Sequence, residues 1–264
     1  MTDDLILRHD DGGVARMVMN APGSLNALSD AMLAALKAQF DAVAADPSVR
    51  VVILAGAGRA FCAGHDLREM QAGRAAPDRG RSYFTSLFAR CAEVMLTIPR
   101  LPQPVIAEVH GIATAAGCQL VASCDMAVAA EGTRFGVNGV NIGLFCSTPM
   151  VALTRNVAPK VAFEMLTTGD FIDAARAREV GLVNRVVPPA ELQAQTMALA
   201  RKVAAKLGAA VKIGKRAFYD QIGLPPGAAY DHAARVMVEN MLWRDTDEGI
   251  AAFLDKRKPD WAQD

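Results

Sequence analysis

Two turns made of small residues are the part of this sequence best suited to chemistry. They cover residues 61–67 and 111–120, and each follows a strongly apolar, strand-like run. Small residues let backbone amides point at one ligand atom. Two amides that converge on a carbonyl oxygen stabilise the negative charge that develops there during acyl chemistry. The two turns therefore predict a site that polarises a carbonyl group.

Each turn leads into a predicted helix, which sets the direction of its amides. Gly64 permits unusual backbone angles just before a helix that begins near Asp66, and the small residues 115–117 would let a ligand approach the backbone closely. Amides at the N-terminus of a helix suit a developing anion. Taken alone, the first turn is also explained by an ordinary strand–helix connection and the second by tight helix packing. Two such turns after two buried strands favour the functional interpretation.

Ionisable side chains are few near these turns. Gln119 ends the second turn, and the next carboxylate along the chain is Asp125. His65 is the best candidate for proton transfer, because histidine titrates near neutral pH. Cys146 is a weaker candidate, since a nucleophilic cysteine needs a depressed pKa and an adjacent base. No spacing of His, Cys or acidic residues suggests a metal site.

Hydrophobic periodicity predicts the elements that position the turns. Strands and helices alternate in the first half, and the pattern from Pro149 onward is nearly all helical. The strand at 51–54 follows a strand and a helix, which predicts parallel pairing. The predicted elements are a strand hairpin at 5–8 and 14–19, a helix at 30–44 capped by Ser29, a mobile loop at 74–81, a helix at 82–96 ended by the prolines from Pro99 onward, strands at 104–109 and 126–130, and a long helix at 190–205.

Composition excludes several classes of protein. The chain has 264 residues, of which 52% are apolar and 21% charged, and its formal net charge is zero. These values predict a globular fold and give no electrostatic reason to expect nucleic acid. No apolar run is long enough for a membrane helix, and the acidic start does not resemble a signal peptide. Five cysteines without a regular spacing predict free thiols in a reducing compartment, and we expect a cytoplasmic protein.

Four ordered motifs resemble the enoyl-CoA hydratase/isomerase, or crotonase, superfamily. They lie at residues 59–67, 104–111, 135–143 and 253–259, so the resemblance covers essentially the whole chain. It implies an α/β fold, built as a spiral of ββα units with a helical C-terminal trimerisation region. We accordingly divide the chain into an acyl-CoA-binding core at 1–195 and a helical oligomerisation segment at 196–264. The resemblance also implies a homotrimer, or a hexamer of two paired trimers.

The same resemblance implies an acyl-CoA thioester as substrate or ligand, with no further cofactor and no metal. Matched by motif, the backbone amides of His65 and Ala116 form the oxyanion hole. The positions matched to substrate or CoA contacts are Ala63, Gly64, Asp66, Leu67, Gly117 and Lys256.

Two positions depart from the pattern of the family. Its hydratases use two glutamates to position water and move its protons, and these align with Gln119 and Gly139. An amide cannot accept a proton at ordinary pH, and glycine has no side chain. General acid–base catalysis contributes roughly 10²–10⁴-fold, so we do not expect hydration by the usual dyad. We expect that replacing both positions by glutamate would raise crotonyl-CoA hydration above that of the parent.

The resulting prediction is an acyl-CoA enzyme of this family, nominally a hydratase (a lyase) or an isomerase of fatty acid metabolism. One alternative is another reaction of the family that uses His65 or bound water, such as isomerisation, decarboxylation or thioester hydrolysis. The other alternative is a non-catalytic oligomer that binds acyl-CoA. Neither nucleic acid nor a membrane is an expected partner.

Overall fold

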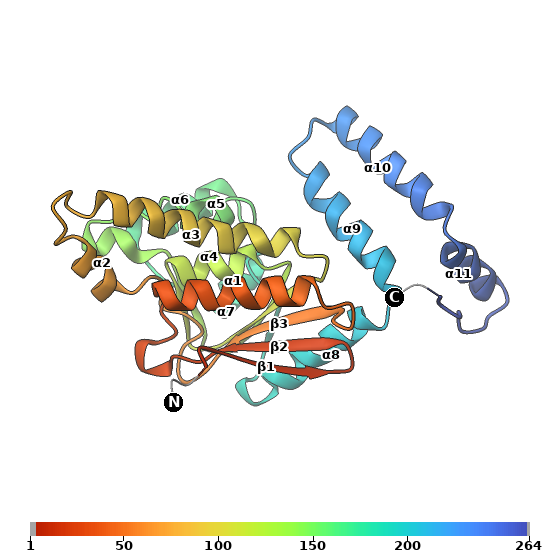
Figure 1. The fold of residues 1–264 in the computed structure, drawn as a ribbon, viewed down its shortest axis with the longest axis horizontal. Helices are drawn as coiled ribbons and strands as arrows, with labels where there is room; N and C mark the ends of the chain where they lie inside the picture. The colour runs from red at the N-terminus through yellow and green to blue at the C-terminus, as the bar shows by residue number, and fades with distance from the viewer. Residues whose placement is uncertain (1–3, 263–264) are drawn as a thin grey trace.

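A six-stranded sheet forms the centre of this α/β protein. The computed structural model describes residues 4–262. The strands are ordered β1-β2-β3-β4-β6-β9 across the sheet (Figure 1). All neighbours pair in parallel except β1 and β2, which form an antiparallel hairpin. The strands are β1 (Ile6–Asp11), β2 (Val14–Met19), β3 (Val51–Gly56), β4 (Val105–Val109), β6 (Met126–Ala130) and β9 (Arg185–Val187).

The N-terminal elements confirm the sequence prediction. The hairpin, the parallel pairing of β2 with β3, and helix α1 (Asp30–Ala44) are all present. The Ser29 side chain accepts a hydrogen bond of 3.1 Å from the backbone amide of Met32, which satisfies one of the free amides at the start of the helix. The buried face of α1 repeats at helical spacing and consists of Met32, Leu33, Leu36, Phe40 and Val43.

Helices cover both faces of the sheet. Helices α1, α3 (Arg81–Arg100) and α4 (Ala116–Ser123) lie on one face, and α8 (Leu192–Ala204) lies on the other (Figure 1). Side chains of a strand alternate between the two faces. In β3, Val52 and Leu54 enter the larger apolar cluster under α1 and α3, while Val51 and Ile53 pack toward α8. This explains why the strand reads as a continuous apolar run.

The structure has a short second sheet that was not predicted, and two short strands lie after Pro149, where the pattern predicted nearly all helix. The sheet has the order β5-β7-β8, with β5 at Ile112–Thr114, β7 at Arg134–Gly136 and β8 at Ile172–Asp173. Both β8 and β9 lie after Pro149 and have only two and three residues. Such short strands show no clear alternation of apolar and polar residues, so periodicity cannot detect them.

Helix α3 is longer than predicted at its C-terminal end. It continues through Pro99 and ends at Arg100, within the proline-containing segment that was predicted to end it but four residues beyond the predicted boundary at 96. The mobile loop predicted at 74–81 corresponds to the turns between α2 (Leu67–Gly73) and α3. Its mobility stays a prediction.

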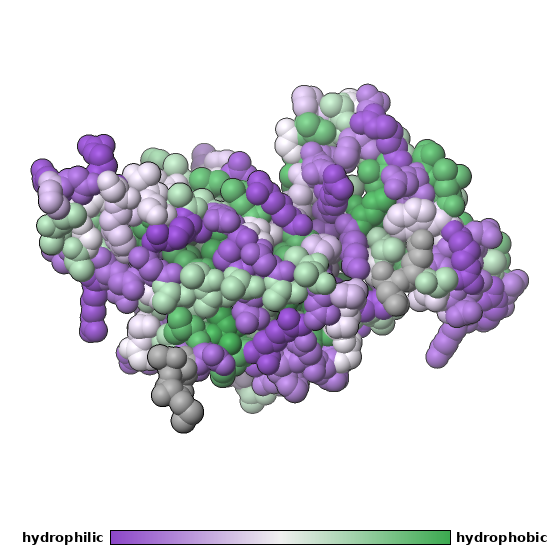
Figure 2. Space-filling view, in the orientation of Figure 1, coloured by the Kyte–Doolittle hydropathy of each residue, from purple (hydrophilic) through white to green (hydrophobic). Residues whose placement is uncertain are grey.

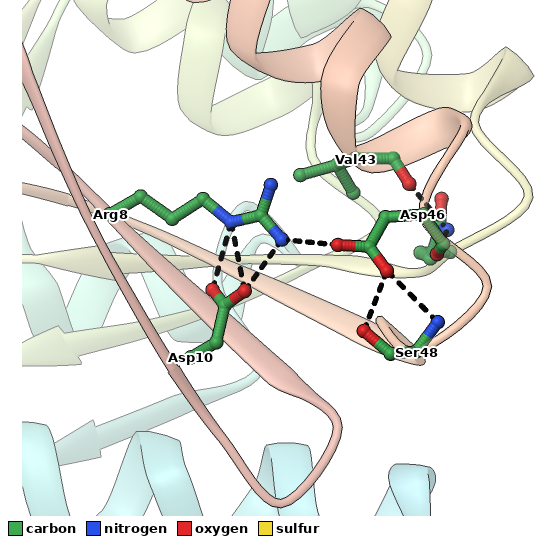
Figure 3. Close-up of polar contacts among 6 residues, drawn as sticks. Arg8, Asp10, Val43, Asp46 and Ser48 are labelled. Carbon is green, nitrogen blue, oxygen red and sulfur yellow. Dashed lines mark hydrogen bonds and ion pairs between the residues drawn. The ribbon is translucent and has the colours of Figure 1, made fainter.

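Ion pairs tie the first hairpin to the connection between α1 and β3. Arg8 donates hydrogen bonds of 2.6 Å to Asp10 and 2.7 Å to Asp46 (Figure 3). Asp46 also accepts hydrogen bonds from the amide and the hydroxyl of Ser48. These contacts lie far from the two turns and stabilise the opposite end of the sheet from the one where the turns meet.

The last three helices extend away from the sheet (Figure 1). They are α9 (Gly208–Gln221), α10 (Pro226–Met241) and α11 (Arg244–Leu254), and we call them the C-terminal arm. Residue 195, where the predicted core ends, lies within α8, and the arm begins with α9. The remaining elements complete the core: helices α5 (Pro149–Leu153), α6 (Pro159–Thr168) and α7 (Ala174–Glu179), with short 3-10 helices at Pro22–Ser24, Asn138–Ile142 and Pro189–Glu191.

Candidate functional site

The two predicted turns lie against each other. The amide of Cys62 donates to the carbonyl of Ile112 at 3.2 Å, and the amide of Thr114 donates back to the carbonyl of Cys62 at 3.1 Å. Gly117 makes this approach possible, because a Cβ at that position would stand 2.2 Å from the Cys62 carbonyl oxygen. The structure therefore brings together two segments separated by about fifty residues of sequence.

Backbone geometry at both turns is unusual. Gly64 has a φ of +89°, and a Cβ there would lie 3.3 Å from the amide nitrogen of Ala116. Ala115, just before α4, has φ 50° and ψ −118°, which lies outside the regions that L-residues normally adopt. Strain of this kind costs about 1–3 kcal/mol and is concentrated at functional sites. Here it precedes the amide of Ala116, the first residue of α4.

The amides of His65 and Ala116 make no hydrogen bond to another residue between 4 and 262. Their neighbours along the chain do: the amide of Ala115 donates to the Gly136 carbonyl at 2.9 Å, and that of Ala63 donates to the Leu25 carbonyl at 3.0 Å. Buried amides are normally paired. Two unpaired amides at adjoining turns are therefore available to a ligand.

The His65 side chain is held on the core side of the first turn. Nδ1 lies 3.4 Å from the Leu28 carbonyl oxygen, which can only accept a hydrogen bond. Nδ1 therefore carries the proton, and Nε2 carries the free lone pair. Nε2 is buried without a partner in the described chain. The ring meets Phe88 edge-on at 5.7 Å between centroids. Burial lowers the pKa of His65 below its ordinary value of 6.5, so the imidazole is neutral at pH 7.

Gln119 lies in α4, one turn after Ala115. Its side chain is within the protein, with the residue only 5% exposed, and its Oε1 is buried without a hydrogen-bond partner. Within residues 4–262 its Nε2 also makes no hydrogen bond. Buried amide groups are nearly always satisfied. The oxygen and the nitrogen of this side-chain amide are thus free to contact a ligand, or a water molecule that a ligand binds.

The backbone leaves no room for a side chain at Gly139. A Cβ would stand 2.2 Å from the Leu144 carbonyl oxygen and 2.9 Å from the Cys146 sulfur. The thiol of Cys146 therefore occupies the space into which a residue-139 side chain would begin to project. The obstacle includes backbone, which a substitution cannot remove. The expected gain in crotonyl-CoA hydration from placing glutamate at both 119 and 139 therefore does not fit this structure.

The thiols of this region are protonated at neutral pH. Burial raises the pKa of Cys62 and of Cys118 to about 12, and it also raises the pKa of Cys146. A protonated thiol is a poor nucleophile. All five cysteines are free and buried, as the spacing predicted.

The carboxylates nearest the turns are bound to other groups of the chain. Asp66 accepts from the amides of Arg68 and Glu69 and caps α2, and Glu69 accepts from the amide of Asp30. Glu108 pairs with Arg16 through Oε1 at 2.5 Å, while its Oε2 is buried without a partner in the described chain. Asp125 accepts from Lys215, Tyr219 and the amide of Val105. No pair of carboxylates is therefore arranged around the two free amides in the described residues.

The other residues that the family resemblance matches to substrate or CoA contacts lie in two separate places. Ala63 and Leu67 belong to the first turn and the start of α2, and Leu67 is exposed. Lys256 follows α11 with an exposed side chain, and α11 lies at the opposite end of the molecule from α2 (Figure 1). Neighbouring Arg257 is paired with Glu248 at 2.6 Å. Within one chain, Lys256 and the first turn do not lie side by side.

Three aromatic residues of α3 were not identified from the sequence, and one of them, Phe88, contacts His65. Phe88 stacks on Phe84 at 6.5 Å, and Phe84 meets Tyr83 at 5.6 Å. The Tyr83 hydroxyl is buried without a partner. The spacing of Phe84 and Phe88 is a signal that could have placed this contact, since residues four apart on one helix share a face.

A surface hollow of about 650 Å³ lies elsewhere and includes none of the predicted site residues. Its lining carries the carboxylates of Glu131, Asp173 and Glu179 together with Arg178. No unpaired buried polar atom faces it among its lining residues. The unpaired amides and side-chain atoms instead identify the region of the two turns as the candidate site.

Comparison with known proteins agrees with the motifs. The sequence profile of the enoyl-CoA hydratase/isomerase family matches residues 9–264. This chain belongs to that family. Among curated relatives, a human protein called enoyl-CoA hydratase domain-containing protein 3, mitochondrial, is 47% identical over 252 residues, which cover 96% of this chain and 82% of the relative. A putative enoyl-CoA hydratase from Thermus thermophilus is 34% identical and covers 95% of this chain and 98% of its own.

Solved structures place the fold within the enoyl-CoA hydratase/isomerase family as well. An enoyl-CoA hydratase from Mycobacterium smegmatis has a TM-score of 0.93 at 55% identity, covering 97% of this chain and 98% of that one. The human domain-containing protein 3 also has a TM-score of 0.93, at 46% identity, covering 97% and 100%. Within residues 4–262, none of the helices combines the length and apolarity needed to cross a bilayer.

Proposed function

We propose that this protein is an acyl-CoA enzyme that polarises a thioester carbonyl between the amides of His65 and Ala116. The observation that carries the proposal is that both amides are unpaired, at turns whose backbones touch. The N-terminus of α4 adds a positive partial charge at the same point. Preorganised amides of this kind stabilise the charge that develops on the thioester oxygen, and one such donor is worth about 2.7–4 kcal/mol.

The usual hydration chemistry is not part of this proposal. Gln119 has no acid–base capacity, and position 139 has neither a side chain nor space for one. The family name supports acyl-CoA as the substrate class, while the residues support only polarisation of its carbonyl. The same lack of proton carriers favours, as a second candidate, an oligomer that binds acyl-CoA without turnover.

Assembly as a trimer or hexamer is also proposed, with the C-terminal arm as the contact region and ββα units repeated in the core. The arm exposes many large apolar side chains (green over α10 in Figure 2), which in a monomer would be costly. Lys256 is far from the first turn of its own chain. If it binds CoA, it does so at the site of a neighbouring copy. Cytoplasmic location stays a prediction, since the word mitochondrial belongs to the names of vertebrate relatives.

Replacement of Gly64 by alanine tests the oxyanion hole. The new Cβ would lie 3.0 Å from the Ala115 Cβ and 3.3 Å from the Ala116 nitrogen, so it would crowd the free amide. We expect binding of butyryl-CoA, measured by calorimetry, to weaken at least tenfold. The control is Gly132→Ala, because Gly132 has a similar φ of +79° but nothing within 4 Å of its Cβ position. Equal affinities for the two variants would contradict the proposed hole.

A further inference from the structure

The side chain of His65 presents a buried hydrogen-bond acceptor. Nδ1 lies 3.4 Å from the Leu28 carbonyl oxygen and donates to it, which leaves Nε2 with a lone pair and no hydrogen. Burial lowers the pKa of the ring, so this nitrogen carries no proton at pH 7. Nε2 has no hydrogen-bond partner among residues 4–262. Buried polar atoms are nearly always paired, so Nε2 requires a partner that the described chain does not provide.

The position of this acceptor relates it to the acyl group rather than to CoA. His65 pairs in parallel with fully buried Leu28, and its side chain lies on the core side of the first turn. CoA is large and charged, so it stays at the surface and the acyl group is the end of the thioester that extends inward. Nε2 stands at the far end of the side chain whose own backbone amide is free. An oxygen on C4 of the acyl group is a comparable number of bonds from the thioester oxygen, so it can reach Nε2 while that oxygen stays at the amide.

Aromatic rings of α3 lie beside the imidazole. Phe88 meets it edge-on with 5.7 Å between ring centroids, and Phe84 stacks on Phe88 at 6.5 Å. Both phenylalanine rings pack against the main apolar cluster and yet remain only half-buried. They therefore keep apolar surface for the methylene groups of an acyl chain. Next to these rings, Nε2 is a single polar atom in apolar surroundings.

Such an acceptor distinguishes between the groups that a ligand can place against it. A hydroxyl donates a hydrogen bond to Nε2 and brings no charge into the protein. A methyl group leaves Nε2 buried and unpaired, which weakens binding. A carboxylate brings both a charge and oxygens that can only accept, so it is disfavoured twice. The surroundings of His65 therefore favour an uncharged acyl group that ends in a hydrogen-bond donor.

We propose that His65 is a specificity-determining residue that selects acyl-CoA thioesters with a hydroxyl group on C4, which donates a hydrogen bond to Nε2. The inference rests on the proposed function, since the amide of the same residue must hold the thioester oxygen. It names the acyl group, which the two free amides leave open. The imidazole binds the hydroxyl through this hydrogen bond and transfers no proton.

Calorimetry at pH 7 with the full chain compares 4-hydroxybutyryl-CoA, 3-hydroxybutyryl-CoA, butyryl-CoA and succinyl-CoA. We expect 4-hydroxybutyryl-CoA to bind about tenfold more tightly than butyryl-CoA, because only the hydroxyl pairs the buried nitrogen. The 3-hydroxy isomer should bind like butyryl-CoA, and succinyl-CoA should bind more weakly. Equal affinities for 4-hydroxybutyryl-CoA and butyryl-CoA, or tighter binding of the 3-hydroxy isomer than of the 4-hydroxy isomer, would overturn the inference.

Two substitutions separate contact with the ligand from support of the turn. The side-chain amide of asparagine reaches the position of Nδ1, and that of glutamine reaches the position of Nε2. His65→Asn thus keeps a donor for the Leu28 carbonyl, and we expect it to lose the preference for the 4-hydroxyl. His65→Gln keeps an acceptor near Nε2 and should retain most of the preference. The reverse pattern would show a structural role and overturn the inference. His9→Asn, at an exposed position of β1, is the control and should leave the ratio of affinities unchanged.

The same measurements separate this inference from the proposed function. Binding of butyryl-CoA without any preference for the 4-hydroxyl would overturn the inference and leave the proposed function standing. Absence of binding by all four thioesters would instead remove the proposed function, and the inference with it.

Discussion

At the scale of single residues, Gln119 and Gly139 stand at the positions that the family resemblance matches to the two catalytic glutamates of hydratases. Gln119 preserves the shape of a glutamate but not its proton chemistry. Gly139 is different, because the Leu144 carbonyl and the Cys146 thiol fill the space its side chain would need. Because one of these obstacles is backbone, a side chain at position 139 would require the backbone to move. These two positions therefore supply no acid–base group.

His65 gives a pH-dependent prediction at the same scale. Its pKa in the folded protein is below 6.5, so the unfolded chain binds more protons as the pH falls through this value. The free energy of unfolding should therefore be fully present above about pH 6.5 and decrease below it. We expect His65→Gln to flatten this decrease between pH 7 and 5.5, measured by urea denaturation. His9→Gln, at an exposed position of β1, is the control; identical pH profiles for His65→Gln and the parent would contradict the prediction.

At the scale of elements, one buried lysine joins the C-terminal arm to the core. Lys215 of α9 donates to the carbonyls of Ile98 and Gln103 at 2.8 Å and to Asp125 at 2.7 Å. Tyr219, one turn later, donates to the other oxygen of Asp125 at 2.7 Å. A single ammonium group thus satisfies the end of α3, the start of β4 and the segment after α4. The position of the arm relative to the site depends on this network.

Lys215→Met should loosen the arm. The substitution leaves two carbonyls and one carboxylate oxygen without their cation, and breaking a buried pair in this way costs about 3–5 kcal/mol. We expect a loss of that size in the free energy of unfolding, with faster proteolysis between α8 and α9. Lys212→Met is the matched control, since Lys212 lies one turn earlier in α9 and makes no hydrogen bond in the described chain. Similar stabilities for the two variants would show that the network does not anchor the arm.

At the scale of the whole molecule, the C-terminal arm exposes large apolar side chains to solvent. The exposed fraction is 81% for Leu242 and 82% for Phe253, and Tyr230, Met237 and Met241 are also exposed. Patches of this kind on a folded protein mark contact surfaces. Contacts between copies would cover these side chains and would also decide whether Lys256 approaches a neighbouring site.

Light scattering tests the assembly. We expect a mass near three or six times the 28.0 kDa of one chain. The double substitution Met237→Glu with Leu242→Glu should shift the protein toward a single chain, because each change places a charge in a contact that excludes water. Leu7→Glu, on the exposed side of β1, is the control and should leave the mass unchanged. A parent protein of 28.0 kDa would contradict the proposed assembly.

Local sequence patterns determined the first half of the fold and the family. Ser29 as a helix cap, the apolar run of β3 and the small residues of the two turns act through neighbours in the chain, so they can be read without a structure. The motifs at both ends of the chain likewise gave the family that the profile match confirms. The roles assigned to His65 and Ala116 stay predictions.

Only the tertiary structure decided what surrounds those two residues. The surroundings of His65 depend on Leu28 and Phe88, and the partners of Asp125 lie on a helix about ninety positions later. Strands β8 and β9 could likewise not be detected in the sequence. Each has only two or three residues, and each pairs with a strand that is distant in the sequence. Long-range packing sets these features, and no local pattern encodes it.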